Sequence, residues 1–235
     1  EIFGGNVNLR NIVINGADDD GLDTDTGWRG AAQFGIVTQR PPNSTSRSAG
    51  FEFSSAPAAT PLASRYVSRP FLANWTLVGR NSPIDAHTVA HFDTGTDPTV
   101  INSVFTNAAG SAAGCLAIAD ADTATSNPTF TSIFMSCGIP YRPSNATLSA
   151  QVFTAGTNNV ANGTSTLTAP ASGTNLTNQV LTFINGANEN GHPVANAPAV
   201  NAFFRSTSYV GAVQNAADTW WQGWTCGLTA NSNCQ

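Results

Sequence analysis

The sequence predicts an all-β fold, a β-solenoid whose coils are followed by a C-terminal capping segment containing a short helix. Three observations support this prediction: a two-part strand unit recurs along the chain, the gaps between units lack helical periodicity, and the composition favours strands and turns. Only 10% of the 235 residues are charged, and none of them is a lysine. Thr, Asn and Gly, which must form much of the surface, are weak helix formers but are common in turns.

The repeated unit consists of a short strand, a turn and a longer strand of alternating apolar residues. Short strands are expected at residues 2–3, 22–24, 51–53, 89–92 and 116–118, and long strands at residues 7–15, 32–38, 71–78, 99–105 and 129–135. Coils stacked about 4.8 Å apart would share one continuous core. Short strands at regular spacing are also typical of an antiparallel sandwich, but the repetition of a two-part unit favours the solenoid.

The cysteines indicate an oxidising compartment, because an even number of them in a lysine-free chain rich in Thr and Asn favours an extracytoplasmic protein. Cys226 and Cys234 flank a short polar loop and are expected to form a small disulfide. Cys115 opens the short strand of the fifth unit and Cys137 closes its long strand, so these two could also pair. Two buried free thiols are the alternative for Cys115 and Cys137.

Two regions are expected within one domain: β-helix coils at residues 1–188 and a C-terminal cap at residues 189–235. Residues 143–188 contain no charged side chain. They contain too many apolar residues for a flexible linker, so irregular coils with long loops are predicted there.

The C-terminal cap is expected to contain a helix, because apolar residues recur at three- to four-residue intervals over residues 209–224. Such a segment would cover the open end of the solenoid, where unpaired strand edges are exposed. The alternative is that Trp220, Trp221 and Trp224 form a platform on which sugars stack.

Four stretches of the chain carry a resemblance to known proteins. They are residues 2–9 (IFGGNVNL), 16–28 (GADDDGLDTDTGW), 209–213 (YVGAV) and 221–225 (WQGWT). The sequence resembles secreted bacterial surface proteins of the pectate-lyase-like group, which are largely uncharacterised. This resemblance implies a right-handed parallel β-helix and an extracellular location, but it assigns no catalytic residue. Members usually have further coils before the first stretch, so a processed or trimmed N-terminus is expected at Glu1.

The densest charge in the sequence is a run of five carboxylates within eight residues, formed by Asp18, Asp19, Asp20, Asp23 and Asp25. Such crowding is costly unless the carboxylates are solvated or neutralised by a cation. Calcium prefers several oxygen ligands on a turn, so Asp18, Asp20, Asp23 and Asp25 are the candidate calcium ligands. The run lacks the pattern of an EF-hand loop. A solvated acidic turn without a metal is the alternative.

A second constellation emerges when the repeats are aligned. The run Asp25-Thr26-Gly27 matches Asp93-Thr94-Gly95, and this match places Asp23 in one column with His91, with Glu52 between them. Asp23, Glu52, His91 and Asp93 are therefore the candidate catalytic residues. Neighbouring carboxylates can hold a general acid beside a general base, as glycan-cleaving enzymes require. An ordinary polar column on a solenoid face is the alternative.

Several classes of function are excluded or lose support. The sequence contains no phosphate-binding loop, dinucleotide fingerprint, nucleophile elbow or HExxH motif. The net charge of −5 argues against nucleic acid as a partner. No apolar run reaches the roughly 18 residues of a transmembrane segment. His87 and His192 lie in polar loops and are expected to be exposed rather than ligands.

Two functions remain. The first is a binding or structural role outside the cell or on its surface, with polysaccharide or neighbouring subunits as partners. Self-association, or a partner protein, would then involve the first coil or the Trp-rich C-terminus. The alternative is a polysaccharide-degrading enzyme, a glycoside hydrolase or a lyase. A lyase would need an arginine base because lysine is absent, and Arg10, Arg29 and Arg69 are the expected neighbours of the acidic face.

Overall fold

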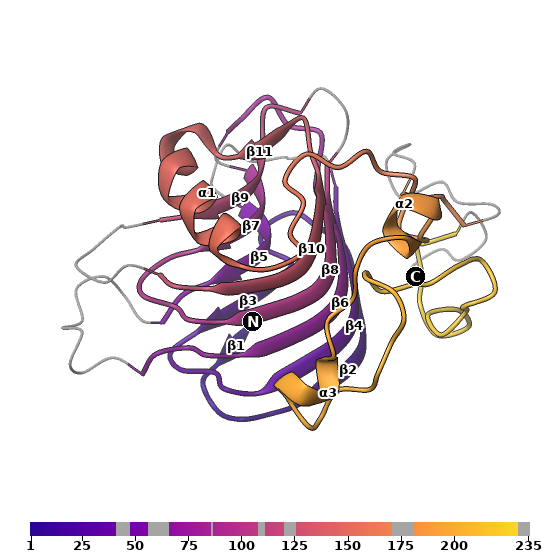
Figure 1. The fold of residues 1–235 in the computed structure, drawn as a ribbon, viewed down its shortest axis with the longest axis horizontal. Helices are drawn as coiled ribbons and strands as arrows, with labels where there is room; N and C mark the ends of the chain where they lie inside the picture. Colours follow the sequence, from indigo (N-terminus) through magenta and orange to yellow (C-terminus); the bar gives the residue numbers. More distant parts are fainter. Residues whose placement is uncertain are drawn as a thin grey trace.

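The chain winds in successive coils through two sheets, and each sheet is made of parallel strands (Figure 1). The computed structural model describes residues 1–40, 48–55, 66–85, 87–107, 111–119, 126–170 and 181–229. The six-stranded sheet contains, in order, β1 (Ile2–Phe3), β3 (Leu22–Asp25), β5 (Ser48–Phe53), β7 (His87–Phe92), β9 (Gly114–Ile118) and β11 (Ile139–Tyr141). The five-stranded sheet contains β2 (Leu9–Ala17), β4 (Ala31–Gln39), β6 (Phe71–Val78), β8 (Thr99–Thr106) and β10 (Thr129–Ser136). The short strands thus form one sheet and the long strands the other, which confirms the predicted parallel β-helix.

Aromatic side chains fill the space between the two sheets. Phe51 contacts Trp75 across the core, with ring centroids 5.0 Å apart, and Phe105 at 6.3 Å. Phe53 and Phe92, on neighbouring strands, are 5.5 Å apart, and all five side chains are fully buried. Because successive residues of a strand point to opposite faces, the residues between these aromatics on the six-stranded sheet point away from the core.

Each long strand bends at one residue with a positive φ. These residues are Asn11, Phe34, Asn74, Asn102 and Ser132, with φ between 49° and 64°. The pairs Gln33–Ala73 and Gly35–Trp75 flank one such position, so the bends of neighbouring strands lie on successive rungs. Asn adopts this left-handed conformation more readily than most residues, which fits its place in the row.

A disulfide joins the last complete coil. Cys115 of β9 and Cys137, which follows β10 directly, are bonded with their Cα atoms 5.7 Å apart. The pairing that the spacing allowed is confirmed, and the alternative of two free thiols is wrong. Cys234 lies outside the described residues, so its disulfide with Cys226 stays a prediction.

A helix covers the end of the last coil, where the sequence predicts only irregular coils. After a short 3-10 turn at Pro143–Asn145, helix α1 spans Ala146–Ala155. Its Phe153 is buried against Phe130 of β10 and Tyr141 of β11, at centroid distances of 5.6 and 6.1 Å. Residues 157–163 then add a partial rung to the five-stranded sheet.

Residues 181–229 lie along the outer face of the five-stranded sheet and include helices α2 (Ala187–Asn190) and α3 (Ala197–Val200) (Figure 1). Side-chain amides of the sheet bind this segment as a peptide group would. The Gln33 side chain donates to the carbonyl oxygen of Arg205 at 2.8 Å and accepts from its backbone N–H at 2.7 Å.

The helix predicted over residues 209–224 is wrong, and so is its expected position over an open end. These residues form turns, and φ is +78° at Gly211 and +83° at Gly223, outside the helical region. Val213 is instead buried on the sheet with Phe183. Because Phe183 already packs there, the chain has left the coils before the expected boundary at residue 188.

Candidate functional site

Three ionisable side chains form a column on the outer face of the six-stranded sheet. Asp23 of β3 is the register partner of Glu52 of β5, and Glu52 is the partner of His91 of β7. The column expected from the sequence is therefore confirmed. It ends at the next rung, where Ala117 of β9 follows His91.

The turns that follow β3 and β7 share one geometry. Thr26 and Thr94 have φ values of 51° and 47°, and Gly27 and Gly95 have values of 91° and 77°. The match between the two Asp-Thr-Gly runs in the sequence thus reflects a repeated turn. The turn after β7 determines where that strand ends, and therefore where Asp93 lies relative to His91 of the column.

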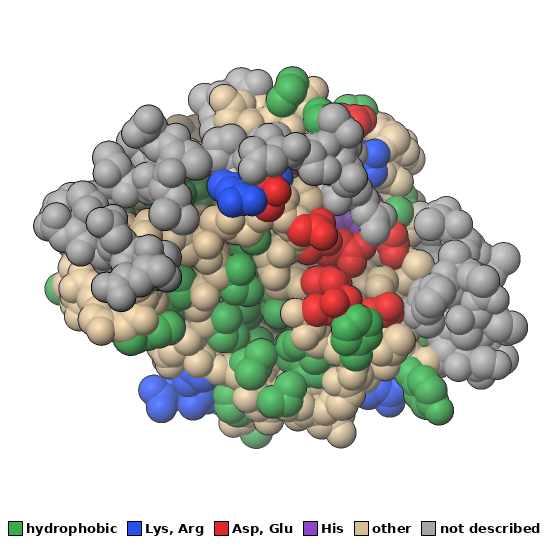
Figure 2. All heavy atoms as spheres, turned by 180° about the vertical axis from the view of Figure 1, so that it is seen from behind, with side chains coloured by type: hydrophobic (Ala, Val, Ile, Leu, Met, Phe, Trp, Pro, Cys, Tyr) green, Lys and Arg blue, Asp and Glu red, His purple; other side chains and the backbone are tan. Residues whose placement is uncertain are grey.

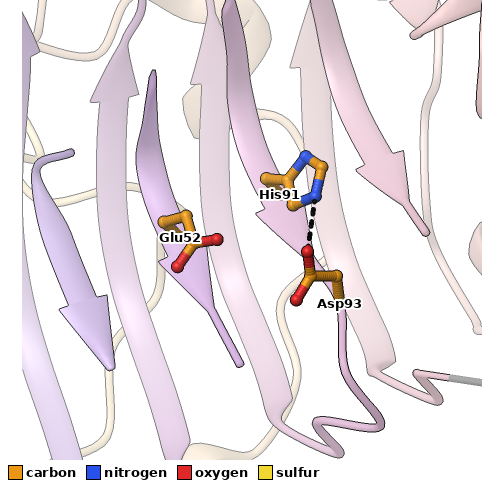
Figure 3. Close-up of side chains that lie close together, drawn as sticks. All are labelled: Glu52, His91 and Asp93. Atoms are coloured by element: carbon orange, nitrogen blue, oxygen red, sulfur yellow. Dashed lines mark ion pairs between the residues drawn. The ribbon is translucent and has the colours of Figure 1, made fainter. Parts of the chain in front are cut away.

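Most of the column is buried although it points away from the core, and Asp23 at its end is half-buried. Glu52 is 7% exposed, His91 1% and Asp93 5%. The Nε2 atom of His91 lies 3.4 Å from an Oδ of Asp93, and Glu52 lies on the neighbouring strand (Figure 3). Burying two carboxylates with an imidazole is costly unless a proton or a cation offsets their charge, and this is typical of functional sites rather than of a plain polar face.

Asp23 holds a proton more tightly than an ordinary aspartate. Burial, followed by the hydrogen bond and charge of Glu1 and the charge of Asp20, raises the pKa of Asp23 from 3.8 to about 6, while a hydrogen bond with Glu52 acts in the opposite direction. Around pH 6 the Asp23 carboxyl group is therefore divided between its protonated and ionised forms, and at neutral pH it is mostly ionised.

The acidic turn beside the column is held by arginines. Asp18 forms an ion pair with Arg40 at 3.0 Å. Arg80, which is 1% exposed, donates to the backbone carbonyl oxygens of Asp18 and Asp19 at 3.0 and 3.3 Å. Sequence analysis missed Arg80, because it lies some sixty residues along the chain and carries no motif. Arg80 fixes the turn rather than facing a substrate.

The candidate calcium ligands do not all come together. Asp20 and Asp23 lie with Glu52, with one oxygen of each within 4.8 Å of the others. Asp18 is paired with Arg40, and an oxygen of Asp25 accepts the backbone N–H of Thr26 at 2.6 Å. Calcium binds oxygens at about 2.3–2.6 Å, so three oxygens this close could share one ion. The set that fits a cation is thus Asp20, Asp23 and Glu52.

The basic residues expected near the acidic face lie elsewhere. Arg10 stacks on Phe203, at 4.2 Å from the ring centroid, and Arg69 forms an ion pair with Asp97 at 3.1 Å. Arg29 donates to the backbone carbonyl of Val67. Figure 2 shows acidic side chains gathered around a histidine on one face of the molecule.

The two remaining histidines are buried, in contrast to the exposed positions expected for them. His87 lies in β7, 1% exposed, with its Nδ1 atom 2.8 Å from the Ser82 hydroxyl. His192 is 8% exposed, and its Nε2 atom lies 2.8 Å from the carbonyl oxygen of Asn158. Both have structural contacts outside the column.

The two stacked sheets of parallel strands define a class of protein, the parallel β-helices. A family model described as pectate-lyase-like β-helix domain matches residues 1–225. The chain belongs to this family, which supports a polysaccharide-associated role. No curated protein and no solved structure matched the chain.

Two features bear on where the protein resides. β-Helix proteins of this family are often extracellular. The disulfide between Cys115 and Cys137 is consistent with an oxidising compartment. Separately, none of the helices among the described residues has the length and apolar character of a membrane-spanning segment.

Proposed function

We propose that the protein is a secreted enzyme that cleaves a polysaccharide at the column of Asp23, Glu52 and His91. The observation that carries this proposal is the pair formed by Asp23, with its pKa near 6, and Glu52 on the next rung. Two adjacent carboxyl groups that share a hydrogen bond provide an acid and a base at the same pH. A passive surface has no need for such a pair.

In this proposal each residue has a distinct role. Glu52, the donor of the hydrogen bond shared with Asp23, protonates the glycosidic oxygen as its bond to the anomeric carbon breaks, and Asp23 attacks that carbon as an ionised carboxylate. Water activated by Glu52 then hydrolyses the glycosyl ester. Carboxyl groups about 5–5.5 Å apart are typical of retaining hydrolysis, and inverting hydrolysis needs a wider gap to admit water. Asp23 and Glu52 share a hydrogen bond and so lie closer than either spacing, and a sugar entering between them must separate the pair, which the shorter, retaining spacing requires least. Asp93 orients His91 beside Glu52.

Hydrolysis fits the described residues better than elimination. A lyase of this fold would need an arginine or lysine that can accept the proton next to a carboxylate, and this chain has arginine but no lysine. The arginines near the column, Arg40 and Arg80, are bound to Asp18 and to backbone carbonyls.

A second candidate is the binding or structural role, stabilised by calcium. It is favoured by the three oxygens of Asp20, Asp23 and Glu52, which are close enough to share an ion. A cation and a proton compete for Asp23, so the two functions respond to calcium in opposite ways. Calcium would inhibit the hydrolase, whereas it would raise the melting temperature of the binding protein and its affinity for glycan.

The test is a panel of polysaccharides incubated with the purified chain, with new reducing ends and unsaturated uronate products measured in parallel. We expect reducing ends without unsaturated products, and a loss of about 10²–10⁴-fold in rate for Glu52→Gln and Asp23→Asn. The control is Asp97→Asn, a carboxylate that pairs with Arg69 away from the column. Glycan binding without cleavage, strengthened by calcium, would select the second candidate instead.

A further inference from the structure

The C-terminal segment carries a pair of tryptophans that the proposed reaction does not use. Trp224 is 56% exposed and Trp220 is half-buried. Their ring centroids lie 6.3 Å apart and their planes are inclined by 32°. Rings in face-to-face contact would be about 3.5–4 Å apart, so these two lie partly side by side. This segment lies on the five-stranded sheet, away from the acidic column on the other sheet.

Hydrogen bonds within the segment fix both rings. The Trp220 indole N–H donates to the carbonyl oxygen of Ala212 at 3.0 Å, and the Trp224 indole N–H donates to that of Trp220 at 2.8 Å. The surface that Trp224 exposes is therefore mainly carbon. A ring already held in place loses little conformational entropy when a ligand stacks on it.

The surroundings of the pair are uncharged on most sides. The flanking exposed residues are small or carry amides: Asn215, Ala216, Ala217, Gln222 and Gly223. The ionisable residue nearest in sequence is Asp218, whose carboxylate accepts the backbone N–H of Gln214 at 3.0 Å. A carboxylate two residues before Trp220 in the sequence disfavours an anionic ligand, whereas amides offer hydrogen bonds to hydroxyl groups.

The exposed area fits a small ligand better than a protein. A tryptophan can bury about 150–250 Å², so the exposed part of Trp224 corresponds to roughly 80–140 Å². A stable protein interface needs about 800 Å² on each partner. A single pyranose ring, with its apolar C–H face and its rim of hydroxyls, matches both the size and the chemistry of this patch.

We propose that Trp220 and Trp224 form a binding subsite for a neutral polysaccharide, with a pyranose ring stacked on Trp224. The subsite lies on the face opposite the acidic column, so it anchors the protein to its polymer and does not contact the bond that is cleaved. It shares only the substrate class with the proposed function and does not depend on Asp23 or Glu52.

The experiment titrates the full chain with cellohexaose, xylohexaose and a galacturonate hexamer, following tryptophan fluorescence and binding heat. The Glu52→Gln background prevents turnover during the titration. We expect a neutral hexamer to bind, and Trp224→Ala to weaken that binding about tenfold, the loss of one stacking contact. Trp224→Phe should recover most of the affinity. Tyr66→Ala, which removes an aromatic side chain that is 74% exposed elsewhere, should leave it unchanged.

The proposal is overturned if neither neutral hexamer binds, if the galacturonate hexamer binds best, or if Trp224→Ala and Tyr66→Ala weaken binding equally. Light scattering that shows an oligomer lost only in Trp224→Ala would also overturn it, because the rings would then contact a protein. If the native chain cleaves a polysaccharide but Trp224→Ala does not change glycan binding, only the proposed subsite is overturned. If glycan binding depends on Trp224 but the native chain cleaves no polysaccharide, only the proposed enzymatic function is overturned.

Discussion

The outer face of the six-stranded sheet carries crowded ionisable groups, whereas the outer face of the five-stranded sheet carries neutral amides. On the first, Asp23 and Glu52 are adjacent and the pKa of Asp23 is raised. On the second, Gln33 and Asn74 are fully buried and hydrogen-bonded to the C-terminal segment. An amide can satisfy a peptide group in both directions, but two carboxyl groups can share a hydrogen bond only while one of them keeps its proton. The outer face of the five-stranded sheet therefore stabilises the fold. The outer face of the six-stranded sheet holds carboxyl groups in an unfavourable electrostatic environment, as acid–base chemistry requires.

The largest effect that tests this contrast is expected at Asn74. Its Nδ2 donates to the carbonyl oxygens of Tyr209 and Gly211 at 3.0 and 3.3 Å, and its Oδ1 accepts from Gln33 at 3.1 Å. Asn74→Ala removes these three hydrogen bonds and places Ala at a positive φ. We expect a loss of about 4 kcal/mol in the free energy of unfolding, and a melting temperature lower by about 10 °C, measured by calorimetry.

Asn74→Gly is the matched control, because Gly tolerates a positive φ but lacks the amide. It should lose most of the same stability, and its difference from Asn74→Ala measures the backbone strain. If both variants melt with the native protein, the amides of this face do not hold the C-terminal segment.

The disulfide links the two sheets, and its removal should have the next largest effect. Cys115 and Cys137 are separated by 22 residues, so the bond lowers the conformational entropy of the unfolded chain. We expect the double variant Cys115→Ala/Cys137→Ala to lose about 3 kcal/mol in denaturant unfolding without reductant. The native protein treated with a strong reductant should lose at least as much, because the bond predicted between Cys226 and Cys234 is then reduced as well. A variant as stable as the oxidised protein would show that the coils need no bond between the sheets.

Much of the outer face of the six-stranded sheet could be predicted from the sequence, because the residues that define it recur in successive coils. The Asp-Thr-Gly runs at residues 25–27 and 93–95 fix one turn, and strand alternation then places Asp23, Glu52 and His91 in register. The ion pairing of the acidic turn was not predictable, since a solenoid brings distant residues such as Arg80 together only when its coils are stacked.

The five-stranded face was harder to predict because its partners are neutral. The residues with a positive φ, such as Asn74, lie in sequences typical of ordinary strands. The sequence also does not indicate that the Asn74 amide hydrogen-bonds to Tyr209, a residue far along the chain. The spacing over residues 209–224 fits a helix, but Gly211 and Gly223 break it and contacts with the sheet replace it. Helix α1 was missed because it buries only Ser149 and Phe153, too few positions to mark a face.

The smallest effect is expected at Asp23, and its sign is opposite to that at Asn74. Burial raises the pKa of Asp23 from 3.8 to about 6. Below pH 3.8 both the folded and the unfolded chain carry the proton, so this group costs no stability. Between 3.8 and 6 the unfolded chain ionises first, so stability falls as the pH rises, and above pH 6 the loss is complete.

Asp23→Asn removes this loss, so its effect should depend on pH. At about pH 8 the variant should melt some 2–4 °C above the native protein, a modest shift because solvent screens the half-buried group. At about pH 4 the two should melt nearly together. Asp97→Asn, the exposed control, should show no such dependence. A shift of equal size at both pH values would point to packing rather than charge, and a lower melting temperature at the higher pH would mean that ionised Asp23 stabilises the fold. The expected result, set beside the loss at Asn74, would show that removing a polar group stabilises one face of the β-helix and destabilises the other.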